Sequence, residues 1–199
     1  PSQDHAAERF EQYASIGDVF AVSSLHRLLA SMNTDIRLKR GQLLSWEDAQ
    51  NRPVIFVGAP SEDLHLSDLP QHQKFVLEHR NHGPRRELVI RNTSPVSGEQ
   101  GEYRLDPRRP ERADYGLITR TVGFDGTSPI LILAGITTLG TEAVADFASD
   151  AHRVSELAGK FGGALPASFS ALLAVEIEGG VPVHARLVGA APASQADPQ

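Results

Sequence analysis

The chain contains no cysteine among its 199 residues. This absence excludes structural disulfides, thiolate catalysis and sulfur-ligated metal sites. No apolar run approaches the roughly 18 residues that would predict a membrane-spanning helix, and no signal-peptide pattern is present. The sequence therefore predicts a soluble domain without a membrane span. It leaves cytoplasmic and periplasmic locations open, and also attachment to a longer membrane-anchored chain.

Positively charged residues are in the minority, since 19 lysines and arginines stand against 25 aspartates and glutamates, for a formal charge of -6. A net negative chain is poorly suited to coat nucleic acid or an anionic membrane, because both require a positive surface. We therefore expect no direct contact between this domain and nucleic acid. The clusters Arg85-Arg86 and Arg108-Arg109 have acidic neighbours, and we interpret them as parts of solvated loops.

The usual catalytic and cofactor-binding motifs are also missing. The chain has no Walker A loop, dinucleotide fingerprint, HExxH motif or Gly-x-Ser-x-Gly elbow, and its eight histidines are scattered. We therefore expect neither a cofactor nor a metal, and we favour a non-enzymatic function over an enzymatic one.

The length and the order of apolar segments predict one α/β domain over residues 13–188, with an N-terminal extension at 1–12 and a disordered tail at 189–199. We expect a three-layer sandwich with a mainly parallel sheet and an antiparallel C-terminal edge hairpin. A helix is expected to follow Asp18, its predicted N-cap. Its core-facing apolar stripe is expected to consist of Val19, Val22, Leu25, Leu29 and Met32.

The other expected elements follow from local patterns. Strands are expected near Tyr13 to Ile16 and at 36–39, 53–57, 114–122 and 130–134, and short helices are expected after Ser45 and Asp150. A first hairpin pairs 74–79 with 87–90, and an irregular excursion covers 93–113. A closing hairpin joins 169–177 to 181–188 around Gly179-Gly180.

Two segments share one design, in which a buried strand ends at a glycine and a helix start with Ser or Thr follows. The first contains Gly58 and Ser61, and the second begins at Gly135. In open α/β sheets, ligands bind beyond the carboxyl ends of strands, where helix N-termini offer unpaired N–H groups. Glu62 and Asp63 cap the first helix themselves, so the second junction is the better anion site. At either junction the alternative is ordinary turn chemistry without a ligand.

We expect a ligand pocket between the loops at Gly17, Gly58 and Gly135. Asp114, which begins the strand before the second junction, is a further expected contact, with a purely loop-ending role as the alternative. The expected ligand-binding residues are Gly17, Asp18, Gly58, Ser61, Asp114, Gly135, Thr137, Thr138, Gly140 and Thr141.

The order of these motifs resembles a bacterial α/β domain found at the C-terminal end of longer regulatory chains. The resemblance covers residues 13–188, and its most specific part is the Ala-Gly-x-x-x-x-Gly-Thr-x-Ala stretch that begins at Ala134. In those relatives the domain follows a winged-helix or another signalling module. The resemblance implies a fold similar to one lobe of a periplasmic binding protein, and it implies no particular ligand or reaction.

Three functions stay open at this point. The first, our working hypothesis, is a sensory or small-molecule-binding domain of a bacterial signalling or transcription-regulatory protein, which takes a small or anionic ligand. The second is an interaction or dimerisation module without a ligand, and it predicts a large flat apolar face and no pocket. A homodimer is among the partners that the sequence leaves open. The third is a small enzyme whose base is Asp114 or a loop histidine.

Overall fold

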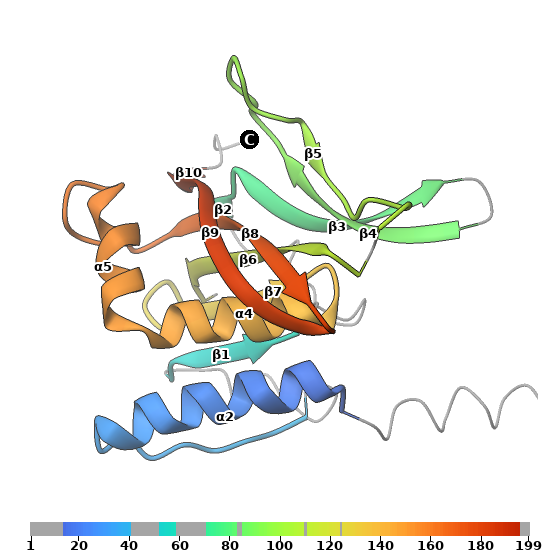
Figure 1. Cartoon of the computed structure of the whole chain (residues 1–199). Coiled ribbons are helices and arrows are strands. Elements are labelled where there is room, and N and C mark those ends of the chain that lie inside the picture. Colours follow the sequence, from blue (N-terminus) through green and yellow to red (C-terminus); the bar gives the residue numbers. More distant parts are fainter. Residues whose placement is uncertain are drawn as a thin grey trace, which may run out of the picture.

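A five-stranded sheet in the order β1-β7-β6-β8-β9 forms the middle of the molecule (Figure 1). The structure is a computed structural model that describes residues 14–40, 52–58, 71–82, 85–109, 111–123 and 125–195. The expected helix starts at Ser45 and Ser61 lie outside the described residues, as does Tyr13. The strands of this sheet are β1 (Val54–Val57), β6 (Ala113–Val122), β7 (Pro129–Gly135), β8 (Phe169–Glu178) and β9 (Val181–Pro192).

The strand directions correct one part of the expected architecture, although the α/β class is confirmed. β1 and β7 are parallel, whereas β6, β7, β8 and β9 pair with their neighbours in the antiparallel direction. The expectation of a mainly parallel sheet is wrong because β6 and β7 are joined by a tight turn. In that turn, Asp125 Oδ1 accepts hydrogen bonds from the N–H groups of Thr127 and Ser128.

The C-terminal hairpin is confirmed, and β9 lies at the edge of the sheet. Gly179 and Gly180 have φ angles of 58° and 78°, which a two-residue type I′ turn requires at both positions. The expected tail begins too early, because β9 continues to Pro192. Beyond it, β10 (Ser194–Gln195) pairs with β2 (Gln71–His72).

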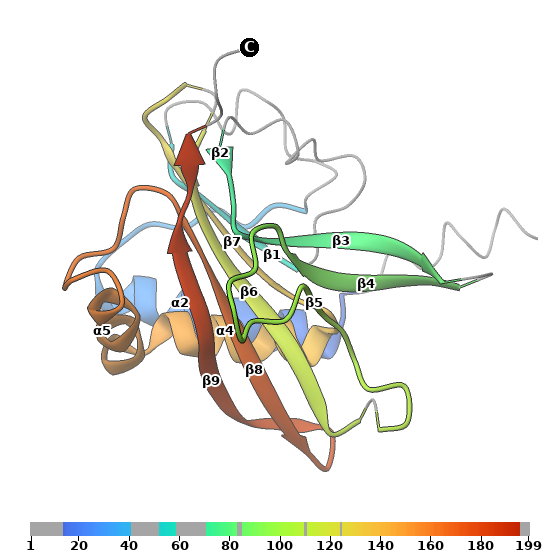
Figure 2. The same ribbon diagram turned by 90° about the horizontal axis from the view of Figure 1, so that it is seen from above.

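A second, three-stranded sheet covers one face of the first and contains the other expected hairpin (Figure 2). It consists of β3 (Phe75–His82), β4 (Arg85–Asn92) and β5 (Glu102–Tyr103). Phe75, Ile90 and Tyr103 from this sheet form one buried cluster with Leu117 and Leu172 from the central sheet. The third layer of the molecule is therefore a sheet.

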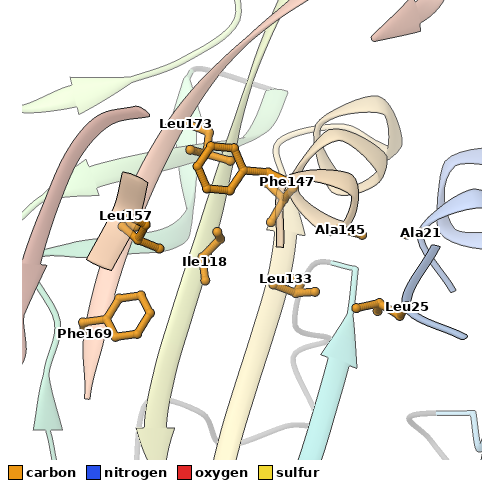
Figure 3. Close-up of a cluster of buried hydrophobic side chains, with 11 residues drawn as sticks. Ala21, Leu25, Ile118, Leu133, Ala145, Phe147, Leu157, Phe169 and Leu173 are labelled. Carbon is orange, nitrogen blue, oxygen red and sulfur yellow. The ribbon is translucent and has the colours of Figure 1, made fainter. Parts of the chain in front are cut away.

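Two helices lie on the opposite face of the central sheet, and both begin at helix starts that the sequence predicts. α4 (Thr138–Ser149) begins after Thr137, and α5 (Ala151–Gly159) begins after Asp150, whose carboxylate accepts from two N–H groups of its first turn. Phe147 of α4 and Leu157 of α5 lie in one cluster with strand residues such as Ile118, Leu133 and Leu173 (Figure 3). None of the helices in the described parts of the chain is long and apolar enough to cross a membrane.

The first described helix, α2 (Ile16–Ser31), packs along α4 with an unexpected side. Its N-cap is Ser15 rather than Asp18, so residues 14–16 do not form the expected strand. The stripe expected to face the core is also wrong in part, because Val19 and Met32 are 56% and 65% exposed. The expected strand at 36–39 is not formed, and residues 34–40 carry no regular structure. The buried residues of α2 are Gly17, Ala21, Ser24 and Leu25.

Candidate functional site

The expected ligand-binding residues, apart from Ser61, meet around the N-terminus of α4. Gly17 lies so close to this turn that a Cβ atom there would be 2.1 Å from the carbonyl oxygen of Thr138. Gly58, with a φ of 100°, lies beside α2, since the carboxylate of Asp18 would be 3.7 Å from its Cβ. Gly17 therefore lies in the first turn of α2 rather than in a loop, and it contacts the first turn of α4. A ligand pocket at this place stays a prediction.

The helix donors at this junction are bound by a carboxylate of the protein itself, that of Asp114. Its Oδ2 atom accepts hydrogen bonds from the N–H groups of Thr137 at 3.1 Å and Gly140 at 2.8 Å, and also from the Thr137 hydroxyl. Its Oδ1 atom accepts from the N–H of Tyr115 at 2.7 Å. An anion is favoured at a helix N-terminus because the unpaired N–H groups and the helix dipole attract it. Asp114 takes that position here.

The antiparallel register of β6 and β7 explains why Asp114 lies at this position. Gly116 is opposite Gly135, so the next step of the same ladder brings Asp114 opposite Thr137, the N-cap of α4. The side chain is 1% exposed, and this burial raises the pKa of the Asp114 carboxyl. Four hydrogen bonds oppose the rise by stabilising the charged form, led by the bond from the Thr137 hydroxyl.

The remaining residues of the junction are engaged in close packing. A Cβ atom on Gly140 would lie 2.7 Å from Asp114 Oδ2, and one on Gly135 would lie 2.3 Å from the backbone nitrogen of Thr141. The Thr141 hydroxyl accepts from the N–H of Gly135 at 3.0 Å and donates to the carbonyl of Thr137 at 3.3 Å. Thr138 is the only one of the three expected threonines with an exposed side chain.

A hollow of about 180 Å³ lies away from this junction, between α4, α5 and the start of β9. Its charged or titratable lining residues are Asp146, Asp150, Arg153 and His184. The Asp146 carboxylate is already bonded to the Ser24 hydroxyl of α2, and Arg153 lies 3.7 Å from Glu156. In the described parts of the chain, no group of three or more His, Asp or Glu side chains is arranged to hold a metal ion.

Exposed apolar side chains gather in a different place, on the outer side of α2 and beside it. Ten large hydrophobic side chains are exposed among the described residues, and seven of them belong to α2, the segment that follows it and β1. Figure 1 shows α2 and that segment along the lower side of the molecule. We call this region the α2 surface; its residues are Ile16, Val19, Phe20, Met32, Ile36, Leu38 and Ile55.

The sequence did not predict the α2 surface, because α2 carries two candidate buried faces, one with large apolar residues and one with small residues. The stripe that begins at Val19 has the larger side chains, and burial of large apolar side chains is the usual expectation. The structure instead turns the small residues Gly17, Ala21 and Ser24 toward α4, where they allow the two helices to approach closely. Their spacing of four and three residues was the available signal.

The resemblance to the C-terminal α/β domain of bacterial regulators stays a prediction. No protein-family model, curated protein or solved structure matches this chain.

Proposed function

We propose that this domain is a protein-interaction module whose contact surface is the α2 surface. The observation that supports it is the concentration of seven of the ten exposed large hydrophobic side chains in one region. Contiguous exposed apolar patches on soluble proteins mark interaction sites more often than scattered single side chains do. Among the described residues, the α2 surface is where exposed large hydrophobic side chains are most concentrated.

The exposure of individual side chains shows how much a partner can gain. Ile16, Val19 and Phe20 are 75%, 56% and 54% exposed, and they follow one another on the first two turns of α2. Full burial of a side chain of this size stabilises a complex by about 1.5–3 kcal/mol. A partner that covers these three side chains therefore has a favourable term large enough to offset part of the entropy cost of association.

The test asks whether the α2 surface is free in the isolated chain. We expect the double variant Val19→Ser, Phe20→Ser to change the free energy of unfolding by less than about 1 kcal/mol, because exposed side chains contribute little to the fold. The fluorescence of the apolar dye anilinonaphthalene sulfonate should fall in this variant. The matched control is Val96→Ser, an exposed valine outside the α2 surface that should leave the dye signal unchanged.

Hydroxyl-radical footprinting of dilute protein gives the opposing outcome. Phe20 and Met32 should react as exposed side chains. Protection of Phe20 in the dilute monomer, together with a loss of stability in the double variant, would mean that the chain covers this surface itself. The proposed function would then be wrong.

The small-molecule function stays a prediction with a separate test. Asp114 competes with any anion for the N–H groups of Thr137 and Gly140, and its charge repels one. Titration with inorganic phosphate should therefore leave the amide NMR signals of these two residues in place. Saturable shifts at both amides would support the small-molecule function instead. The enzymatic alternative has little support at Asp114, because that side chain is only 1% exposed.

A further inference from the structure

We infer that α2 is a detachable helix, which separates from α4 as one unit while the central sheet, α4 and α5 stay folded. This opening involves the inner side of α2, so it is independent of what binds the outer side. It makes the face of α4 beneath α2 accessible.

α2 contributes little to the core for a helix of 16 residues. Only four of its residues are buried, and two of these, Gly17 and Ser24, carry no apolar side chain. The other two, Ala21 and Leu25, belong to a cluster of eleven buried residues, nine of which come from α4, α5 and the central strands. The core next to α2 is therefore built mainly by other elements.

Close backbone contact and one polar group hold α2 against α4. Gly17 packs against the backbone of Thr138, and a residue without a side chain buries little apolar surface there. The Ser24 hydroxyl donates to Asp146 Oδ1 and accepts from Arg27 Nη2 at 3.1 Å. Because Asp146 and Arg27 are exposed, water competes for these hydrogen bonds, and their net contribution is small. Opening therefore breaks few interactions that water cannot replace.

The large apolar side chains of α2 do not oppose the opening. Ile16, Val19 and Phe20 are already more than half exposed in the closed position, so they lose little burial when α2 leaves. An isolated helix of this length is only marginally stable in water. α2 therefore unfolds locally when it separates, as a unit of low stability at the edge of a more stable fold.

Opening uncovers a defined apolar strip of α4 and β7. Ala145 and Leu133 are both 0% exposed, and Figure 3 shows them on the side of α4 and β7 that faces Ala21 and Leu25. Val57 of β1 packs against the same cluster. In the closed state α2 itself occupies this strip, which becomes accessible only after α2 has separated.

The absence of cysteine allows the opening to be measured by thiol labelling. Ala145→Cys places one thiol beneath α2. The control Ala171→Cys places one on β8, which two strands separate from β1, at a position that is also 0% exposed. Under native conditions a maleimide reagent should label Ala145→Cys at least about tenfold faster, equivalent to about 1.4 kcal/mol. Urea unfolding gives the global stability of each variant, and equal labelling rates after correction for it would overturn the inference.

Hydrogen exchange of the unmodified chain covers the case in which a cysteine variant folds poorly. The amide of Leu25, in the middle of α2, should exchange at least about tenfold faster than that of Val144 in α4. Ala21→Leu adds bulk between the two helices and should accelerate exchange in α2 several-fold more than in α4. Ala30→Leu makes the same change on the exposed side of α2 and should leave this exchange unchanged.

Two exchange patterns would overturn the inference. In the first, the central amides of α2 exchange as slowly as those of α4, so that α2 opens only when the whole chain unfolds. In the second, exchange is fast only at the two ends of α2, because fraying ends do not amount to the release of the helix as one unit.

Discussion

Asp114 occupies the position at which an external anion would bind in other helix N-termini. Its carboxylate accepts from Tyr115, Thr137 and Gly140, and it connects the start of β6 to the first turn of α4. The same contacts account for the glycine at 140, because any side chain there would collide with the carboxylate. Three of the expected ligand contacts, Asp114, Thr137 and Gly140, are therefore bound to one another, and we call this group the Asp114 clamp.

Removal of the carboxylate tests this clamp. We expect Asp114→Ala to lower the free energy of unfolding by about 2–4 kcal/mol, because several buried donors lose their acceptor together. Urea unfolding measures the effect. The control Asp106→Ala removes an exposed aspartate that accepts one bond from the N–H of Arg108, and it should cost much less.

The pH dependence of the same variant has a defined sign. Burial raises the pKa of Asp114 above its ordinary value of 3.8, so the folded chain holds this proton more tightly than the unfolded chain does. The stability that Asp114 contributes is therefore largest at low pH and decreases as pH rises through its folded pKa. The difference in unfolding free energy between wild type and Asp114→Ala should shrink over that interval. A difference that grows with pH would mean that the hydrogen bonds outweigh burial.

Among the elements, those with specific caps and turns were predictable and α2 was predictable only as a helix. Asp150 caps α5, Thr137 caps α4, and Gly179-Gly180 turns β8 into β9 through local chemistry that the sequence displays directly. The buried side of α2 depends instead on its neighbour. Gly17 can approach α4 only because the backbone at Thr138 lies there, and that contact spans more than a hundred residues of sequence.

Glu99 anchors the loop after β4 to Lys74, the residue before β3, and to Asn92 at the end of β4, and it gives the element-scale prediction. Its carboxylate lies 2.8 Å from Lys74 Nζ and accepts from Asn92 Nδ2 and the N–H of Val96. These contacts, led by the bond from Lys74, lower its pKa from 4.5 to about 2. The contribution of Glu99 to stability is therefore present above pH 4.5 and is lost as pH falls toward 2.

The variant Glu99→Gln should accelerate amide exchange at Val96 at pH 7, and the difference from wild type should shrink as pH falls to 2. Hydrogen exchange followed by NMR or mass spectrometry measures both conditions. Glu176→Gln, an exposed glutamate on β8, serves as the control and should leave exchange in the excursion unchanged. Equal acceleration at both pH values would contradict the role of the charge.

For the whole molecule, the long strands and the two hairpins were predictable, but the antiparallel pairing of β6 with β7 and β8 was not. Alternation of apparent strands and helices favoured parallel pairing, and it relied on a strand at 36–39 that the structure lacks. β3 and β4 leave the central sheet and form a layer of their own. The contact of Asp114 with the N-terminus of α4 also depends on the direction of pairing. Only antiparallel pairing of β6 with β7 brings Asp114 to Thr137.

The two faces of the central sheet carry separate cores, which leads to a prediction for the whole molecule. Phe75 is 1% exposed, lies edge-on to Tyr103 at 6.4 Å, and its N–H donates to the Ser170 hydroxyl. Figure 2 shows that this second sheet lies on the side of the central sheet opposite to α4. We expect Phe75→Ala to cost about 3–5 kcal/mol.

The loss of stability caused by Phe75→Ala should be uneven across the molecule, because Phe75 belongs to only one of the two cores. Hydrogen exchange should increase first in β3 and β4, while α4 keeps its protection. Phe147→Ala, which opens the core on the helical face, should reverse the order and loosen α4 first. If both variants instead raise exchange equally in all elements, the two cores unfold as one cooperative unit. The α2 surface would then depend on both layers of the fold.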